Sequence, residues 1–209
     1  TLAELGYESI EVACGNWSKA PHINLDEMLE SESARKEFMQ AIESRGLVLE
    51  TLNCSGNQLA PNDEGKQHQL VVEKTFKLAG LLGIKTVVMM SGCPGGAPED
   101  TTPNWITTSW PPITTEILEW QWNEVLIPYW KDAAELAKSH GVEKIALENH
   151  GAQMVYNTET LIRLRDAVGP IIGMNLDPSH LMWMGGDPIV AAYKLGAERI
   201  NHVHKKMCA

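Results

Sequence analysis

Charged and imidazole side chains follow three apolar stretches in the second half of the chain. The stretch "KIALENHG" carries Glu148, "IIGMNLDPSH" ends in Asp177 and His180, and "INHVHKK" contains His202 and His204. In parallel α/β proteins, ligands bind at the carboxyl ends of the strands. Mixed carboxylate and imidazole donors suit Mn²⁺, Zn²⁺, Co²⁺ or Fe²⁺, and Mg²⁺ is less favoured by the imidazole. The pattern therefore predicts a divalent metal site at these strand ends.

Each of these residues also has a structural interpretation. A single strand-end glutamate such as Glu148 is commonly solvated or caps a helix, and Asp177 before Pro178 could simply open a turn. His180 could cap a helix or pack against Met182. An HxH pair places both imidazoles on the same face of a strand, where one of them could be a satisfied core group. The combination on three successive strands favours the metal site over these alternatives.

The elements that would position these residues alternate along the chain. Short apolar runs typical of strands alternate with longer amphipathic stretches typical of helices, and glycine marks most of the joins. The predicted strands are 9–13, 47–52, 85–90, 144–147, 171–176 and 200–203. The predicted helices are 34–44, 66–82, 116–140, 158–167 and 188–195, with a long loop over 91–115 and a kink or split at Pro128. This alternation predicts an α/β fold of parallel strands with helical crossovers.

Among parallel α/β folds, a TIM barrel is favoured over a doubly wound sheet. The stretch "ACGNWS" after the first predicted strand lacks the GxGxxG spacing of a dinucleotide site. A complete barrel needs about 250 residues, whereas this chain has 209. We therefore expect residues 1–209 to form a single (β/α)-barrel domain that is incomplete, with about six of the eight units, missing the first strand and the last units.

The two ends of the sequence are the basis of that expectation. The opening "TLAELG" is typical of the last turn of a helix, and the closing "INHVHKKMCA" stops just after a strand. Six strands do not close a barrel of this type, so two edges would carry unpaired backbone groups. We expect further residues to cover these edges. The alternatives are a second copy that pairs edge to edge in a homo-oligomer, and an aggregation-prone fragment that is not an active enzyme.

Composition limits the classes of partner. A net charge of -10 and a pI near 5.1 argue against a nucleic-acid surface, which would need clustered Lys and Arg. The sequence has no apolar run of about 18 residues that would predict a membrane span, and no basic region followed by an apolar one at its start. The four cysteines have no CxxC spacing, which fits a reducing cytoplasm.

The order of Glu148, "DPSH" and "HVHKK" on successive units resembles the xylose-isomerase-like TIM-barrel superfamily, in particular its sugar phosphate isomerase/epimerase group. The stretch "GYESIEV" is similar to the second strand of that group. The resemblance implies that Glu148, Asp177 and His204 are metal ligands, and that His180 contacts the substrate or, in some members, the metal. It assigns no ligand role to His202, which we expect to be structural. The family's fourth ligand, a Glu on the eighth strand, has no counterpart here.

The resemblance implies a divalent-metal-dependent isomerase or epimerase. Its substrate would be a small sugar, sugar phosphate or related hydroxy-ketone, and proton transfer through an enediolate would use Glu148 as the catalytic carboxylate. A keto-inositol dehydratase-type lyase and a non-catalytic barrel that only binds a ligand or partner are the alternatives. Endonuclease IV-type members use additional histidines after the third and fourth strands. Here those strand ends, "LNCSGN" and "MMSGCPGG", contain none, which argues against DNA repair.

Other residues are candidates for contact with a small polyhydroxylated substrate. Glu11 and Asn53 lie near strand ends and could hydrogen-bond hydroxyl groups, although a turn role for Asn53 is equally open. Trp17 and Trp105 could stack on the apolar face of a sugar, with core packing as the default, and the long loop that carries Trp105 suggests a lid. Lys206 could meet a carboxylate or an enediolate, with solvent exposure as the alternative.

Overall fold

A computed structural model of the protein describes residues 2–205 and contains, within that range, one sheet of six strands. The strands are β1 (Ser9–Ala13), β2 (Val48–Asn53), β3 (Thr86–Met89), β4 (Lys144–Glu148), β5 (Ile172–Leu176) and β6 (Ile200–Val203). They lie side by side in chain order, and every neighbouring pair is parallel. The predicted strands are thus confirmed to within one residue at each end.

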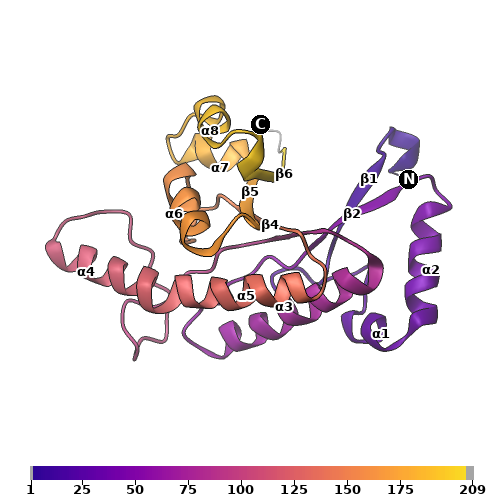
Figure 1. Ribbon diagram of the computed structural model, residues 1–209, viewed down its shortest axis with the longest axis horizontal. Coiled ribbons are helices and arrows are strands. Elements are labelled where there is room, and N and C mark those ends of the chain that lie inside the picture. The colour runs from indigo at the N-terminus through magenta and orange to yellow at the C-terminus, as the bar shows by residue number, and fades with distance from the viewer. Residues whose placement is uncertain (1, 206–209) are drawn as a thin grey trace.

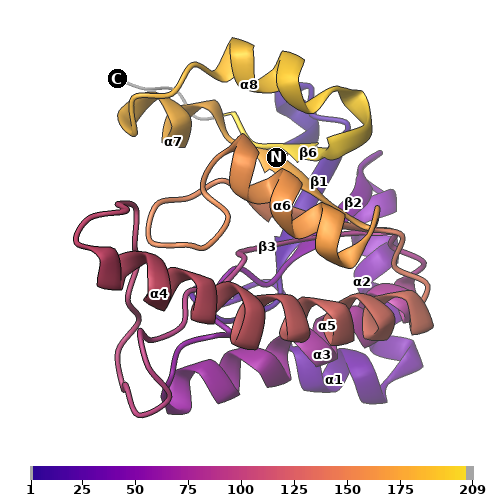
Figure 2. The same cartoon turned by 60° about the vertical axis from the view of Figure 1, so that its left-hand side comes forward.

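The helices form an outer arc around the curled sheet (Figures 1 and 2). They are α1 (Leu25–Glu30), α2 (Glu32–Glu43), α3 (Asp63–Leu82), α4 (Pro112–Trp120), α5 (Ile127–Ser139), α6 (Thr158–Val168), α7 (Pro178–Trp183) and α8 (Pro188–Leu195). Short 3-10 turns cover Ala3–Leu5 and Ala197–Arg199. This architecture is an incomplete (β/α) barrel, as the alternation predicts. Within residues 2–205, the structure contains no helix with the length and apolar content needed to cross a bilayer.

Two short helices and one helix start differ from the prediction. The helices α1 and α7 have six residues each, which is too short for a 3.6-residue apolar repeat to become visible in the sequence. Helix α4 begins at Pro112, inside the stretch expected to be a loop. Proline at the first helical position is compatible with a helix start, because the missing N–H would have no partner there anyway.

The expected interruption at Pro128 is present. A π-helical segment, Gln121–Leu126, lies between α4 and α5, and Pro128 sits in the first turn of α5. Proline lacks an N–H donor and its ring clashes with the carbonyl four residues earlier. The π-helical turn directly before the proline is wider than an α-helical turn, which relieves this clash. The helical stretch therefore continues without a gap from α4 through the π-helical segment into α5.

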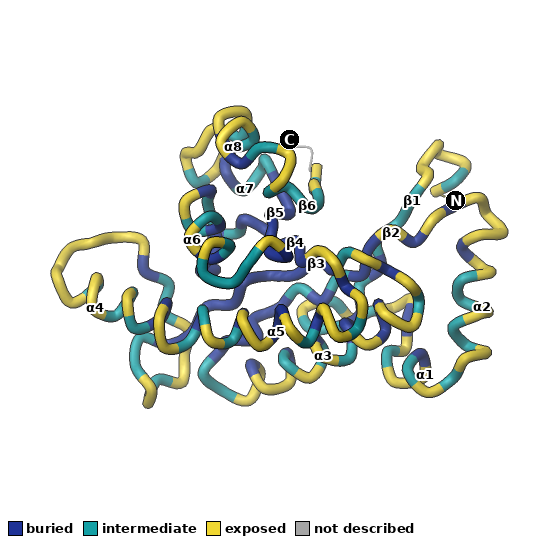
Figure 3. The backbone as a smooth tube through the Cα atoms, viewed as in Figure 1, coloured by how far each residue is buried: buried dark blue, intermediate teal, exposed yellow. Residues whose placement is uncertain are grey.

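The most deeply buried part of the sheet is its middle. Strands β3, β4 and β5 are buried along almost their whole length, whereas β1 and β6 at the edges are mostly half-buried (Figure 3). Central strands of a parallel sheet are covered on both faces, which is why they are nearly continuous apolar runs in the sequence. The buried end of β4 and the residue after β5 carry Glu148 and Asp177 into this environment.

The strand register shifts at both edges of the sheet, close to candidate site residues. One shift falls between Ile10 and Glu11 on β1, and the other falls where Asn175 of β5 pairs with His202. A bulge adds a residue to one strand and turns the following side chains to a new direction. The extra residue of the first shift is Glu50 of β2, opposite Glu11, and that of the second is Asn201 of β6, just before His202; the sequence pattern reveals neither.

Asn201 occupies the bulge on β6. Its side-chain amide donates to the carbonyl oxygens of Ile145 (2.9 Å) and Ile171 (3.1 Å), and it lies over Gly173. A Cβ at Gly173 would stand only 2.3 Å from Cγ of Asn201. Glycine at that position therefore gives Asn201 the room to anchor the edge strand to β4 and to the residue before β5.

Candidate active site at the strand ends

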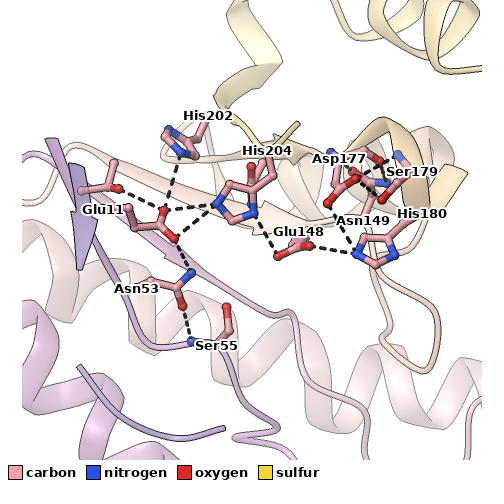
Figure 4. Close-up of polar contacts among 12 residues, drawn as sticks. Glu11, Asn53, Ser55, Glu148, Asn149, Asp177, Ser179, His180, His202 and His204 are labelled. Carbon is pink, nitrogen blue, oxygen red and sulfur yellow. Dashed lines mark hydrogen bonds and ion pairs between the residues drawn. The ribbon is translucent and has the colours of Figure 1, made fainter. Parts of the chain in front are cut away.

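Glu148, Asp177 and His180 form the first cluster of candidate ligands, at the carboxyl ends of β4 and β5 (Figure 4). Nε2 of His180 lies 3.0 Å from Oε1 of Glu148 and 3.6 Å from Oδ2 of Asp177. One ligand atom from each residue lies within 4.8 Å of the others. Glu148 is 4% exposed and Asp177 is 0% exposed. Two carboxylates and an imidazole thus converge in a buried environment.

The local fold explains the position of Asp177. Its Oδ1 accepts hydrogen bonds from the N–H (2.9 Å) and the hydroxyl (2.5 Å) of Ser179, which caps the start of α7. Asn149 holds the backbone of Asp177 from both sides, since it accepts from the N–H (2.8 Å) and donates to the carbonyl (2.9 Å). The turn that "DP" suggests is therefore present, and the second carboxylate oxygen, Oδ2, faces His180 at the same time.

Glu11, His202 and His204 form the second cluster of candidate ligands (Figure 4). Nε2 of His202 lies 3.5 Å from Oε2 of Glu11, and Nε2 of His204 lies 3.3 Å from the same carboxylate. Thr51 (3.0 Å) and Asn53 (2.8 Å) donate further hydrogen bonds to Glu11. Both imidazoles of the HxH pair therefore face the same carboxylate from the opposite edge of the sheet.

His204 joins the two clusters. Its Nε2 faces Glu11, while its Nδ1 lies 3.4 Å from Oε2 of Glu148 and 3.0 Å from the amide nitrogen of Asn175. The hydrogen bonds to Glu11 and Glu148 raise the pKa of His204 to about 10, against the opposing effect of burial. His204 thus bridges the carboxylates of Glu11 and Glu148.

The other members of the second cluster respond to the same contacts. Burial acts to raise the pKa of Glu11, but hydrogen bonds from His204, Asn53 and Thr51 outweigh it and bring the pKa below the ordinary value. Burial lowers the pKa of His202, and the charge of Glu11 only partly opposes this. At neutral pH, Glu11 is therefore charged and His202 neutral.

The structure brings the predicted metal ligands together in pairs. Glu148 contacts His204 and shares a cluster with Asp177, but the imidazole closest to both carboxylates is that of His180. His202, for which a structural role is expected, lies beside Glu11 in the second cluster. Sequence position alone does not distinguish these pairings.

Several predicted substrate contacts have other partners in the structure. Asn53 closes a turn by accepting from the N–H of Ser55 (2.7 Å), and its amide supports Glu11. Trp17 is half exposed and lies edge-on to His68, with ring centroids 6.4 Å apart. Lys206 lies outside the described residues.

Trp105 lies close to Gly151, together with Trp183 of α7. A Cβ at Gly151 would stand 3.5 Å from Cη2 of Trp105 and 2.7 Å from Cη2 of Trp183. Trp105 also packs edge-on against Tyr156, with ring centroids 5.3 Å apart. The two indoles therefore converge over Gly151, three residues after Glu148.

His150 is a nearby residue that the sequence argument does not select. Its ring centroid lies 4.2 Å from that of His180, and its Nδ1 lies 2.6 Å from the carbonyl oxygen of Gly151. The signal that could have indicated it is its place in "ENHG", two residues past Glu148 and just beyond the end of β4.

A comparison of the whole chain with models of protein families agrees with the sheet topology and with the carboxylates at the strand ends. A family model described as "Xylose isomerase-like TIM barrel" matches residues 1–207. The chain belongs to this family.

Known proteins are similar to the chain in sequence and in structure. The uncharacterized protein YfiH of Bacillus subtilis (strain 168) is 58% identical over 206 residues, which cover 98% of this chain and 66% of that protein. The crystal structure of D-psicose 3-epimerase with D-tagatose from Clostridium cellulolyticum H10 has a TM-score of 0.65 and 16% identity, covering 99% of this chain and 65% of that chain.

A zinc-containing structure has the same fold. The crystal structure of the IOLI protein with a binding zinc atom has a TM-score of 0.63 and 20% identity, covering 97% of this chain and 64% of that chain. This xylose isomerase-like chain therefore spans about two thirds of the length of these relatives. At identities of 20% or below, the two solved structures indicate a shared fold.

Proposed function

We propose that the protein is a divalent-metal-dependent isomerase or epimerase of a small sugar, sugar phosphate or related hydroxy-ketone. The observation that carries the proposal is the pair of buried carboxylates in the first cluster, Glu148 and Asp177, whose ligand atoms lie within 4.8 Å of each other, with Nδ1 of His204 3.4 Å from Oε2 of Glu148. This cluster lies at the carboxyl ends of the strands, where TIM barrels hold their active sites. The zinc atom in the structure of the IOLI protein supports a metal in this fold.

The chemistry of the donors fits a divalent cation. Glu148 and Asp177 would hold it, with Nδ1 of His204 as the third donor. Such mixed oxygen and nitrogen sets are typical of Mn²⁺, Zn²⁺ and Co²⁺. Two carboxylates that are 4% and 0% exposed need strong compensation for lost hydration, which a dication supplies. When bound, the ion would polarise the substrate carbonyl and stabilise the negative charge that develops on its oxygen.

Glu148 would move the proton. Its carboxylate would accept a proton from the carbon next to the carbonyl, and the electrons of the broken C–H bond would form the C=C bond of an enediolate. If Glu148 keeps this proton and an acid on the opposite side donates one to the other face of the same carbon, the product is an epimer. Return of the proton to the former carbonyl carbon, with a hydroxyl proton passing to the other oxygen, gives an isomer. Trp105 and Trp183 would cover the apolar face of the substrate over Gly151.

Deuterium exchange tests this proposal even though the substrate has not been identified. The protein would be incubated with Mn²⁺ or Zn²⁺ and a panel of ketoses in D₂O, and NMR would follow loss of the proton next to the carbonyl. We expect exchange with the wild type and none above background with Glu148→Gln. Glu143→Gln is the matched control, because Glu143 forms a surface ion pair with Lys85. Equal exchange by the Glu148→Gln variant and the wild type would contradict the role of Glu148.

The same reactions distinguish the alternative functions. A product lighter by one water in mass spectrometry would identify a lyase, because the proton is abstracted in the same way but a hydroxyl group leaves. Metal binding without exchange or water loss for any member of the panel would favour a barrel that only binds a ligand. Proton exchange and loss of water are both measured on the same reaction samples.

A further inference from the structure

We propose that Trp183 holds His180 in the tautomer that carries its proton on Nε2. In this form Nε2 of His180 donates its one proton to Glu148 and has no lone pair to offer a metal ion. Trp183 is then a positioning residue that acts through His180. The statement about the metal rests on the function proposed above, whereas the tautomer itself does not.

The hydrogen-bond partners of His180 determine the tautomer. Nε1 of Trp183 lies 3.1 Å from Nδ1 of His180. An indole N–H can only donate, so Nδ1 must be the unprotonated acceptor. The remaining proton of a neutral imidazole is then on Nε2, which lies 3.0 Å from Oε1 of Glu148. A proton on Nε2 can be donated to this carboxylate oxygen, so this one tautomer satisfies both contacts.

The opposite tautomer would make both contacts unfavourable. A proton on Nδ1 would point at the N–H of Trp183, and the lone pair of Nε2 would face the oxygens of Glu148 and Asp177. Metal ligation through Nε2 requires that lone pair, because a ligating imidazole nitrogen carries no proton. Ligation would therefore break the bond to Trp183. The third donor beside Glu148 is His204, whose Nδ1 lies 3.4 Å from Oε2.

One end of the indole rests on Gly151, although Trp183 is 61% exposed. The end of the Trp183 ring lies where a Cβ on Gly151 would be, at 2.7 Å from Cη2 and 3.0 Å from Cζ2. A methyl group at this buried position would displace the indole, because the nearest atoms are at the far end of that side chain. Gly151→Ala thus removes the hydrogen bond while leaving both His180 and Trp183 in the chain.

His150 supplies an internal reference. Its Nδ1 lies 2.6 Å from the carbonyl oxygen of Gly151, which can only accept, so Nδ1 of His150 carries a proton. His150 and His180, whose ring centroids are 4.2 Å apart, are therefore in opposite tautomers. The two signals should show opposite patterns in the same spectrum.

Long-range ¹H–¹⁵N NMR of the metal-free, histidine-labelled protein tests the tautomer. Assignment would use His180→Gln and His150→Gln, each of which removes one set of signals. We expect Nδ1 of His180 at the shift of an unprotonated imidazole nitrogen and Nε2 at that of a protonated one, with the reverse for His150. A protonated Nδ1 in His180 would overturn the proposal.

Two variants test the role of Trp183. Trp183→Phe and Gly151→Ala should both change the Nδ1 shift of His180 from its wild-type value, because the indole no longer donates to it. Trp110→Phe is the matched control, since Trp110 is 75% exposed on the loop before α4, and it should leave the His180 signals unchanged. If both test variants are folded and keep the wild-type shifts, Trp183 does not position His180.

Addition of Zn²⁺ to the same sample tests the statement about the metal. We expect Nε2 of His180 to keep its proton when zinc is bound, and loss of that proton with gain of one on Nδ1 would show ligation and overturn the proposal. Calorimetry of zinc binding separates the two proposals. Absence of binding would contradict the proposed function, while the tautomer in the metal-free protein would still decide the inference about Trp183.

Discussion

Glu11 and His204 are 193 residues apart in the sequence, yet Nε2 of His204 lies 3.3 Å from the carboxylate of Glu11. Glu11 belongs to the first strand and His204 directly follows the last one. The sheet is curled so strongly that side chains from its two edge strands meet across the mouth (Figure 4). Through His204, this contact continues to Glu148 in the middle of the sheet.

Removal of the charge on Glu11 should destabilise the protein. Both partners are 24% exposed, between a surface pair, which contributes little, and a buried pair, whose disruption is costly. We expect Glu11→Gln to lower the free energy of unfolding by about 1–2 kcal/mol, measured by urea denaturation. Glu50→Gln on the neighbouring strand is the control, because Glu50 is exposed and bonds only the Ser9 hydroxyl among the described hydrogen bonds. Equal effects of the two changes would argue against a stabilising contact.

Asp177 and Asp187 provide a matched pair for metal binding. Each precedes a proline and caps a short helix through Oδ1, to Ser179 in one case and to Ile189 in the other. A ligand present at 100 times its dissociation constant stabilises the folded state by about 2.7 kcal/mol. We expect Mn²⁺ to raise the melting temperature of the wild type and of Asp187→Asn, but not of Asp177→Asn, because asparagine keeps the cap and loses the anionic ligand. Retained stabilisation in Asp177→Asn would exclude Asp177 as a ligand.

The packing of Asn201 over Gly173 predicts a non-additive pair of substitutions. Gly173→Ala alone should destabilise the protein by about 1–3 kcal/mol, because its methyl group would collide with the amide of Asn201. In an Asn201→Ala background the space is open, so the same change should cost much less. Denaturation of the two single variants and the double variant gives the coupling. Additive effects would show that the two residues do not share this space.

The buried cysteines should be unreactive in the native state. Burial raises the pKa of Cys14 and of Cys93 to about 12, and it also raises the pKa of Cys54. The thiolate is the reactive form, so in a Cys208→Ser background a disulfide reagent at pH 8 should label no thiol until denaturant is added. Rapid labelling of the native protein would contradict this burial.

The same pKa shifts predict how stability depends on pH. Because the folded protein keeps these protons longer than the unfolded chain, the buried thiols favour folding fully below the unfolded pKa, about 8.5. This contribution is lost as the pH rises towards 12. Urea midpoints measured from pH 7 to 10 should therefore fall above pH 8.5, and Cys14→Ala should reduce the slope. An unchanged slope in that variant would contradict the assignment to Cys14.

The sequence by itself was enough to determine the strands, the parallel order and the edge of the sheet that carries the chemistry. These features depend on local periodicity and on short joins such as the αL glycine Gly83 after α3, both of which are written in adjacent residues. The carboxylates Glu148 and Asp177 were predictable for the same reason, because each comes at the end of an apolar run. The short helices α1 and α7 were not, since six residues show no repeat.

Only the tertiary structure decided which side chains meet. The contact of Glu11 with His202 and His204 depends on the curl of the whole sheet and on the bulges beside Glu11 and Asn201. The tautomer of His180 depends on an indole from α7 that is seated on a glycine after β4. These relationships are distances between residues far apart in the chain, and no local pattern encodes such distances because they result from the packing of all the elements together.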